Sequence, residues 1–220
     1  MADTAPARSR SGRRQRKRER MASHLAATAF ELFEEQGYDA VTMEQIAAEA
    51  DVAKATLYSY FPMKEALVAH RLRDEIAEGM AARAGALAAR RGFGSRMRYL
   101  LRESAAWHAS RRAYLPHYLR YLNIIATFVP AEADDKAPAG GARITLEAMA
   151  EMFLQGQQAG EVTAAVPAER LAWSLQYLLF GSVAWWLAHP DTDLEEGFLQ
   201  AFDVLLKGAA AGRAGNRTKR

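Results

Sequence analysis

The 220-residue sequence contains no cysteine. This absence excludes disulfide bonds, thiol nucleophiles and metal sites with cysteine ligands. The N-terminal stretch also lacks the apolar core of a secretory signal peptide. These absences favour a cytoplasmic protein, and we expect it to bind no metal and no cofactor.

Motifs for catalysis are missing as well. The sequence has no glycine-rich phosphate loop and no nucleophile motif, and its histidines lack the i, i+4 spacing of a helical metal site. They are His24, His70, His108, His117 and His189. We therefore expect that the chain is not an enzyme.

Strand signals are nearly absent, whereas apolar residues recur at helical spacing through most of the chain. The predicted fold class is therefore all-α. Besides two short helices within 42–61, the pattern predicts helices over 18–36, 63–89, 95–110, 114–128, 142–158, 167–189 and from about 193 to Gly208. Proline, glycine and aspartate predict a surface loop over 130–141.

The stretch from Thr42 to Phe61 carries the most specific pattern. Thr42 followed by Gln45 predicts a capping box that begins a short helix. A turn at Asp51 separates this helix from a second one, in which Leu57 and Phe61 can point inward. Two short helices joined by a tight turn are typical of a helix-turn-helix, which presents its second helix to DNA.

The run from Phe33 to Leu67 resembles the DNA-binding domain of tetracycline-repressor (TetR) family regulators. The matching positions are Phe33, Gly37, Tyr38, Thr42, Ile46, Ala47, the segment 53–58, Phe61, Lys64, Glu65 and Leu67. The resemblance implies a homodimer that binds a pseudo-palindromic operator on double-stranded DNA, usually as a repressor. It also implies that a small molecule switches the protein by tilting the helix predicted over 63–89.

Three residues depart from the pattern of this family. Asp51 stands where glycine is usual in the turn, Ala53 where a capping serine or threonine is common, and Ala55 where glycine is frequent. Because aspartate is a good N-cap residue, Asp51 is a candidate cap of the recognition helix.

Charge is distributed unevenly near the N-terminus. Residues 1–20 contain eight basic and two acidic side chains, whereas residues 21–66 contain two basic and eight acidic ones. The acidic segment repels DNA, so the basic arm is expected to supply much of the attraction through counterion release. The arm lacks apolar residues and is predicted to be disordered until it binds. An inert tail and a targeting or membrane-surface signal are the alternatives.

The candidate DNA contacts lie in this arm, at helix starts and on the recognition helix. Lysine can donate to guanine, a threonine methyl can contact thymine, and a carboxylate can accept from cytosine N4. A solvated role for Glu44 and a packing role for Tyr60 remain open. The predicted DNA-binding residues are Thr42, Glu44, Lys54, Ala55, Thr56, Tyr58, Tyr60, Lys64, Arg13, Arg14, Arg16, Lys17 and Arg18.

The helix predicted over 167–189 is apolar on every face, with no formally charged residue between Arg170 and Asp191 apart from a possible charge on His189. Such a helix must be buried on all sides, in a large core, between a core and a second subunit, or in a membrane. Resemblance to the family favours a dimer built from the last two helices. The alternative is a membrane-associated protein that uses this helix and the basic arm. The predicted dimer residues are Phe180, Gly181, Ala184, Phe198, Phe202 and Leu205.

Aromatic residues are concentrated between residues 95 and 180. They could line an apolar effector pocket, although an aromatic stripe at helical spacing is more often ordinary core than a set of ligand contacts. The predicted ligand-binding residues are Trp107, Tyr114, His117, Tyr118, Tyr121, Phe153, Trp173 and Tyr177. The predicted organisation is a disordered arm (1–17), a three-helix DNA-binding domain (18–66), a helical ligand-binding and dimerisation domain (67–208) and a basic tail (209–220).

Overall fold

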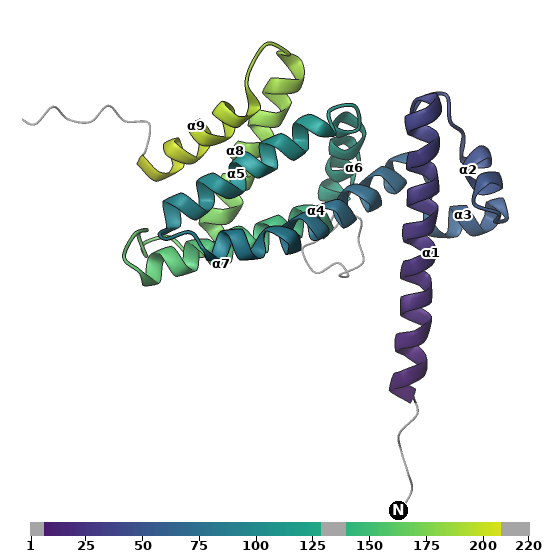
Figure 1. The fold of residues 1–220 in the computed structure, drawn as a ribbon, viewed down its shortest axis with the longest axis horizontal. Coiled ribbons are helices and arrows are strands. Elements are labelled where there is room, and N and C mark those ends of the chain that lie inside the picture. Colours follow the sequence, from purple (N-terminus) through teal and green to yellow (C-terminus); the bar gives the residue numbers. More distant parts are fainter. Residues whose placement is uncertain (1–6, 129–139, 208–220) are drawn as a thin grey trace, which may run out of the picture. The chain divides into compact units, whose positions relative to one another are not determined.

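A computed structural model describes residues 7–128 and 140–207, and every regular element within these stretches is a helix (Figure 1). This confirms the predicted all-α fold. The helices are α1 (Ala7–Gln36), α2 (Met43–Glu49), α3 (Lys54–Tyr60), α4 (Lys64–Ala88), α5 (Phe93–Ser110), α6 (Leu115–Phe128), α7 (Gly140–Gln158), α8 (Ala168–Ala188) and α9 (Leu194–Lys207). The predicted loop lies outside the described residues except for 140–141, which begin α7, and the basic tail lies wholly outside them.

The chain divides into two compact units. The first contains Met1–Arg83 and Ala113–Thr145, and the second contains Ala84–Arg112 and Leu146–Arg220. The predicted boundary at residue 66 differs from this division, because the first unit includes most of α4 and all of α6. Stacking of His117 in α6 on Tyr38, with ring centroids 3.7 Å apart, is one contact that holds α6 in the first unit.

The core of the first unit is built from the inward faces of short and long helices together. Leu25 in α1, Ile46 in α2 and Leu57 in α3 have no exposed surface. Burial of each such side chain contributes about 1.5–3 kcal/mol. The helical spacing of these residues in the sequence is therefore explained by a common core.

Helix α1 begins much earlier than the sequence pattern predicts. It extends from Ala7 to Gln36, so the described part of the predicted disordered arm is helical (Figure 1). Arginine, lysine, glutamine and glutamate are strong helix formers even where they bury nothing. Within this stretch Gln15 Nε2 donates to Glu19 Oε1 at 2.6 Å, a contact one helical turn apart. The basic residues Arg13, Arg14, Arg16 and Lys17 therefore lie on a helical continuation of a core helix.

The core of the second unit forms where α9 packs against α5 and α8. Phe198 and Phe202 in α9 are 1% and 0% exposed. The ring of Phe202 lies 5.8 Å from that of Phe93, and the ring of Phe198 lies 5.5 Å from that of His108. Both phenylalanines are therefore core residues of their own chain.

The spacing of Thr192 and Glu195 in the sequence predicts a second capping box, at the start of α9, and the structure differs from this prediction. Asp193 Oδ1 accepts hydrogen bonds from the backbone N–H groups of Glu195 and Glu196, at 2.8 and 3.5 Å. Thr192 Oγ1 instead donates to the carbonyl of His189 at 2.7 Å. The expected box was wrong because an equally good capping residue follows one position later.

Candidate DNA-binding surface

Helix α2 begins with the predicted capping box. Gln45 N donates to Thr42 Oγ1 at 3.2 Å, and Thr42 N donates to Gln45 Oε1 at 2.8 Å. The Thr42 hydroxyl also donates to Gln45 Oε1 at 3.0 Å. The hydroxyl proton of Thr42 is therefore used within the capping box, where it helps to fix the direction of α2, and it is not free to donate to a phosphate.

The turn between α2 and α3 satisfies the last carbonyls of α2. Val52 N donates to Ala47 O at 2.9 Å, and Asp51 N donates to Ala48 O at 3.1 Å. These two bonds form a Schellman motif, which requires a left-handed residue after the helix. Asp51 takes that conformation with φ of 51°. It therefore ends α2, whereas α3 begins after Ala53 without a side-chain cap, so the expected capping role of Asp51 was wrong.

Helix α3 has one inward and one outward face. Leu57 and Phe61 pack in the core, while Lys54, Ala55 and Tyr58 are exposed. Thr56 is half-buried between the two faces. The exposed residues lie on one face of the helix at helical spacing, so all of them can contact DNA when the helix lies in a major groove.

Two of the predicted contact residues lie against each other. Lys54 Nζ lies 3.5 Å from Glu44 Oε1, and both side chains are largely solvent-accessible. The two residues belong to the first turns of α3 and α2. The helix-turn-helix thus presents a basic and an acidic group at one point of its surface.

Lys64, a predicted DNA contact, also makes contacts within the domain. Its ammonium donates to the carbonyls of Tyr38 and Val41, both at 2.7 Å. It also lies 4.3 Å from the ring centroid of Tyr38, within cation–π range. Two of its three N–H groups are therefore used to fasten the start of α4 to the segment before α2.

The basic part of α1 reaches the recognition helix at Tyr60. The Arg18 guanidinium lies 5.3 Å from the Tyr60 ring centroid, and Tyr60 is only partly exposed. This contact gives Tyr60 the packing role that the sequence left open. The other basic residues assigned to DNA on this helix are exposed, namely Arg13, Arg14, Arg16 and Lys17.

Comparison with known proteins identifies this arrangement. The family model for bacterial regulatory proteins of the tetR family matches residues 25–70. The structure is similar to that of Thermus thermophilus FadR, a TetR-family transcriptional repressor solved with lauroyl-CoA. The two share 25% identity with a TM-score of 0.73, over 88% of this chain and 97% of that one. The chain belongs to the TetR family of transcriptional regulators.

Two further relatives of this TetR-family regulator show what is shared. The HTH-type transcriptional regulator YuxN of Bacillus subtilis is 42% identical over 44 residues, which span 20% of this chain and 15% of YuxN. FadR from Bacillus subtilis, solved with stearoyl-CoA, is 16% identical over 85% of this chain and 98% of that one, with a TM-score of 0.59. The first comparison supports the DNA-binding segment, and the second supports the fold alone. As a regulator of this family, the protein binds DNA through its helix-turn-helix and is not an enzyme.

The predicted dimer residues of this TetR-family regulator fall into two groups. Phe198 and Phe202 are buried within the chain, so they cannot form a surface for a second subunit, and this part of the prediction was wrong. Gly181 and Ala184 lie on the exposed side of α8, and Phe180 and Leu205 are half-exposed. The sequence could not separate these groups because apolar periodicity indicates that a helix face is buried but does not identify what covers it.

The predicted ligand residues are also divided. Trp173 and Tyr177 are 48% and 63% exposed and stack on each other, so they do not line an enclosed pocket. Phe153 is fully buried against Phe93 in the second unit, where Trp107 is partly buried. The remaining four belong to the first unit, in or directly before α6, and they are Tyr114, His117, Tyr118 and Tyr121.

Two of these tyrosines have altered acidity. Burial raises the pKa of Tyr121 to about 12 and raises that of Tyr118 further. Among the described residues, the Tyr118 hydroxyl has no hydrogen-bond partner. A neutral, buried hydroxyl of this kind can donate to a polar group of a bound molecule. Tyr114 packs differently, with its ring 4.7 Å from that of Phe30 in α1.

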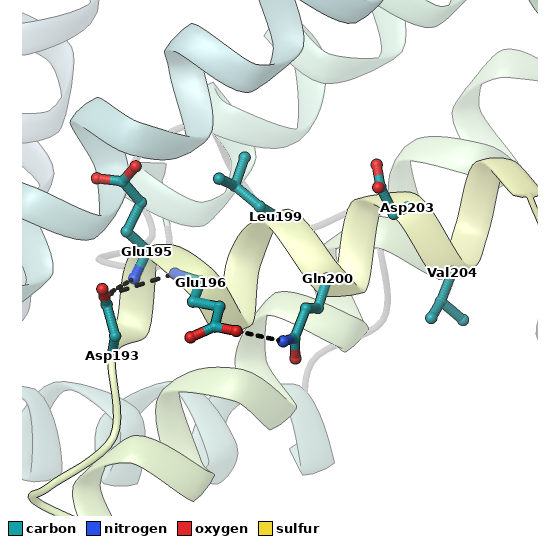
Figure 2. A pocket seen from close by; sticks show the side chains of 7 residues that line it. All are labelled: Asp193, Glu195, Glu196, Leu199, Gln200, Asp203 and Val204. Carbon is teal, nitrogen blue, oxygen red and sulfur yellow. Dashed lines mark hydrogen bonds between the residues drawn. The ribbon is translucent and has the colours of Figure 1, made fainter.

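A hollow along α9 contains none of the predicted ligand residues. Its lining consists of Asp193, Glu195, Glu196, Leu199, Gln200, Asp203 and Val204. Figure 2 shows these side chains spread over both sides of the helix instead of converging on one point. Two of the carboxylates are already paired, since Glu195 accepts from Arg102 Nε at 3.0 Å and Asp203 accepts from Arg98 at 2.7 Å. This acidic surface does not suit an apolar effector.

Sequence reasoning missed one surface residue and one structural role. Trp185 is 60% exposed on α8 and stacks on His189, with ring centroids 3.8 Å apart. Its position four residues after Gly181 places it close to the predicted dimer residues, which was the available signal. The pairing of Glu44 with Lys54 joins two helices and could not be read from spacing along the chain.

Proposed function

We propose that this TetR-family regulator is a repressor that binds a pseudo-palindromic operator as a homodimer in the bacterial cytoplasm. A small, largely apolar or aromatic effector switches it. The main support for DNA binding is the outward face of α3, where Lys54, Ala55 and Tyr58 are exposed while Leu57 is buried on the other side of the helix. The small side chain of Ala55 allows the helix to come close to base edges in the major groove.

The proposed DNA contacts divide by chemistry. Lys54 and Thr56 read bases, with Glu44 beside them, and the Tyr58 hydroxyl contacts phosphate. The exposed basic side chains of α1 supply most of the attraction to the DNA backbone. Tyr60 positions Arg18 through the ring contact already described. Thr42 and Lys64 orient the domain through their hydrogen bonds within the chain. Each can contact phosphate only through donor groups that these hydrogen bonds do not use.

The proposed dimer uses the exposed face of α8. This face is apolar. An exposed apolar face is unfavourable in water, so it marks a surface that a partner covers. Aromatic residues are enriched in protein interfaces, and glycine and alanine allow two helices to approach closely. The face consists of Trp173, Tyr177, Gly181, Ala184 and Trp185. An isologous contact of this face closes a two-fold dimer, which matches a palindromic operator.

A membrane role for α8 is the weaker alternative. By length and composition alone, α8 could cross a membrane, but core helices of soluble proteins meet the same criteria. Leu175, Leu179 and Val183 on its opposite face are buried in the second unit. A helix packed on one side and exposed on the other is better suited to a subunit interface.

The proposed effector is an acyl-chain compound. Support comes from FadR of Thermus thermophilus and of Bacillus subtilis, whose structures contain lauroyl-CoA and stearoyl-CoA. In the first unit of this chain, the buried Tyr118 hydroxyl is available to donate to a polar group of the effector, and Tyr121 provides apolar surface. Trp173 and Tyr177 are assigned to the dimer instead.

Selection of bound DNA from a random pool tests the proposed function. We expect an enriched palindrome with two half-sites about one helical turn apart or a multiple of it. Lauroyl-CoA should then change the affinity for this DNA by about 5- to 150-fold, whereas CoA alone should not. Absence of any enriched sequence would contradict DNA recognition. An enriched site that is insensitive to lauroyl-CoA would contradict only the effector.

A further inference from the structure

The contact between Lys54 and Glu44 lies at the centre of the proposed reading surface. Lys54 Nζ and Glu44 Oε1 are 3.5 Å apart, and the side chains are 65% and 47% exposed. Residues 21–63 contain no other lysine and no arginine. The cation that the helix-turn-helix offers to base edges is therefore held next to a carboxylate.

Stability does not account for this pair. Exposed ion pairs contribute about 0–1 kcal/mol, because water screens the attraction and both long side chains lose freedom. A carboxylate on a DNA-facing surface also repels the phosphate backbone. An acidic group at this place therefore works against binding unless it meets a donor on the DNA.

The pair matches the pattern of groups on one base pair. In the major groove, guanine presents two acceptors, O6 and N7, and its partner cytosine presents a donor at N4. An ammonium group only donates and a carboxylate only accepts. Lys54 can therefore donate to O6 or N7 of guanine while Glu44 accepts from N4 of the cytosine paired with it.

An A·T pair fits the two residues less well. Adenine N6 can donate to a carboxylate, but the ammonium then finds a single acceptor on each base, and the thymine methyl lies beside O4. A charged group next to that methyl loses hydration without compensation. The difference between the two pairs favours G·C and also fixes its orientation, because exchanging the bases exchanges donor and acceptors.

We infer that Glu44 and Lys54 together read a single G·C base pair in each operator half-site. This inference rests on the proposed DNA-binding function and adds a specificity-determining pair to it. Because the two charges cancel, the pair contributes to sequence preference and little to the salt dependence of binding. A lysine that contacts phosphate behaves in the opposite way.

The experiment compares single and double variants on the selected operator and on operators changed at each position. Lys54→Ala and Glu44→Ala should each lower discrimination at the same base pair, by between about fivefold and about 150-fold. The double variant should lose discrimination at that same base pair, by no more than the product of the two single losses, since the two contacts are neighbours and not independent. The salt slope should change by less than the approximately 0.9 expected for one phosphate contact.

Two control variants separate base reading from general charge effects. Glu49→Ala removes another exposed carboxylate from α2 and should leave the preferred sequence unchanged. Lys17→Ala should weaken binding to all sequences equally and flatten the salt slope by about 0.9. All four residues are exposed, so circular dichroism is expected to show an unchanged fold.

The outcomes are distinct. Loss of discrimination at one shared G·C position supports the inference. Loss at two different positions, at an A·T pair, or at no position overturns it while leaving DNA recognition intact. A protein that enriches no sequence at all overturns the proposed function together with the inference.

Discussion

Lys64 shows how a residue on a DNA-facing domain can be committed to the fold. Its ammonium group donates to the carbonyls of Tyr38 and Val41. Lys64→Met keeps an aliphatic side chain but leaves both carbonyls without this partner. We expect the free energy of unfolding to fall by about 1.5–3 kcal/mol, the range for hydrogen bonds to charged groups. Urea denaturation followed by circular dichroism measures the change.

Lys54→Met is the matched control for this substitution. Lys54 is exposed and forms an exposed ion pair with Glu44, so its replacement should change the unfolding free energy by no more than about 0.5 kcal/mol. The opposite pattern, with a stable Lys64→Met that binds DNA poorly, would return Lys64 to the phosphate role predicted from the sequence.

Capping shows where residue-level prediction succeeds and where it fails. Thr42 was predicted correctly because Gln45 supplies the second half of the box, so two residues had to agree. Asp51 was misassigned because aspartate also tolerates the left-handed conformation that ends a helix. Asp193 competed with Thr192 one position away. Where two neighbouring residues can satisfy the same backbone groups, tertiary packing decides between them.

At the scale of elements, helix positions followed from the sequence better than helix ends and faces. The periodic apolar residues of α4 to α9 predict each of these helices. The basic start of α1 was assigned to disorder because it buries no apolar surface, yet its residues favour helix and continue a helix that is already nucleated. Extension adds one hydrogen bond per residue without a new nucleus, which explains the error.

The apolar stripe of α9 was assigned to the wrong partner. Phe198 and Phe202 are spaced for a helix interface, but the interface is with α5 and α8 of the same chain. Sequence periodicity indicates that a face is buried and does not identify what covers it. The structure buries one side of α8 in the core, and this burial identifies the opposite, exposed side as the candidate dimer face.

The proposed dimer face leads to a prediction at this scale. Tyr177→Glu places a charge on the exposed side of α8, so it should yield a folded monomer with weak operator binding. Phe202→Glu places a charge in the core and should unfold the second unit, with a loss well above about 3 kcal/mol. Light scattering reports the subunit number, and circular dichroism reports helix content.

The subunit number and the helix content of the two variants together test whether α8 or α9 forms the dimer interface. A Tyr177→Glu protein that remains dimeric at micromolar concentration would place the interface away from the α8 face. A Phe202→Glu protein that is folded and monomeric would restore the original assignment of α9 to the dimer.

For the whole molecule, the separation of charge between residues 1–20, which include the basic start of α1, and the acidic residues 21–66 governs attraction to DNA. Replacing Arg13, Arg14, Arg16 and Lys17 by glutamine preserves helix propensity and removes four exposed positive charges. If each neutralises a phosphate, the slope of log K against log salt should flatten by about 3.6. Filter binding over a range of salt concentrations measures it, and an unchanged slope would make the basic part of α1 irrelevant to DNA.

Acid stability is a property of the whole molecule because each compact unit contains a histidine that resists protonation. Burial, followed by the nearby Arg73, lowers the pKa of His70 to about 4 despite the opposing effect of Asp74. Burial also lowers the pKa of His108 to about 4, although its ring bonds to the Ser104 carbonyl at 2.7 Å. Unfolding restores the ordinary value of about 6.5, so the unfolded chain binds protons that the folded chain does not.

The histidine contribution to stability should therefore be complete above about pH 6.5 and decline as the pH falls towards 4. Each histidine adds at most about 1.4 kcal/mol per pH unit to this decline. Urea denaturation between pH 7 and pH 4.5 should show a shallower decline for His108→Gln or His70→Gln than for the original protein or for His24→Gln, whose side chain is exposed. If all four proteins decline equally, the acid sensitivity arises from carboxylates, and His70 and His108 bind protons equally in the folded and unfolded states over this range.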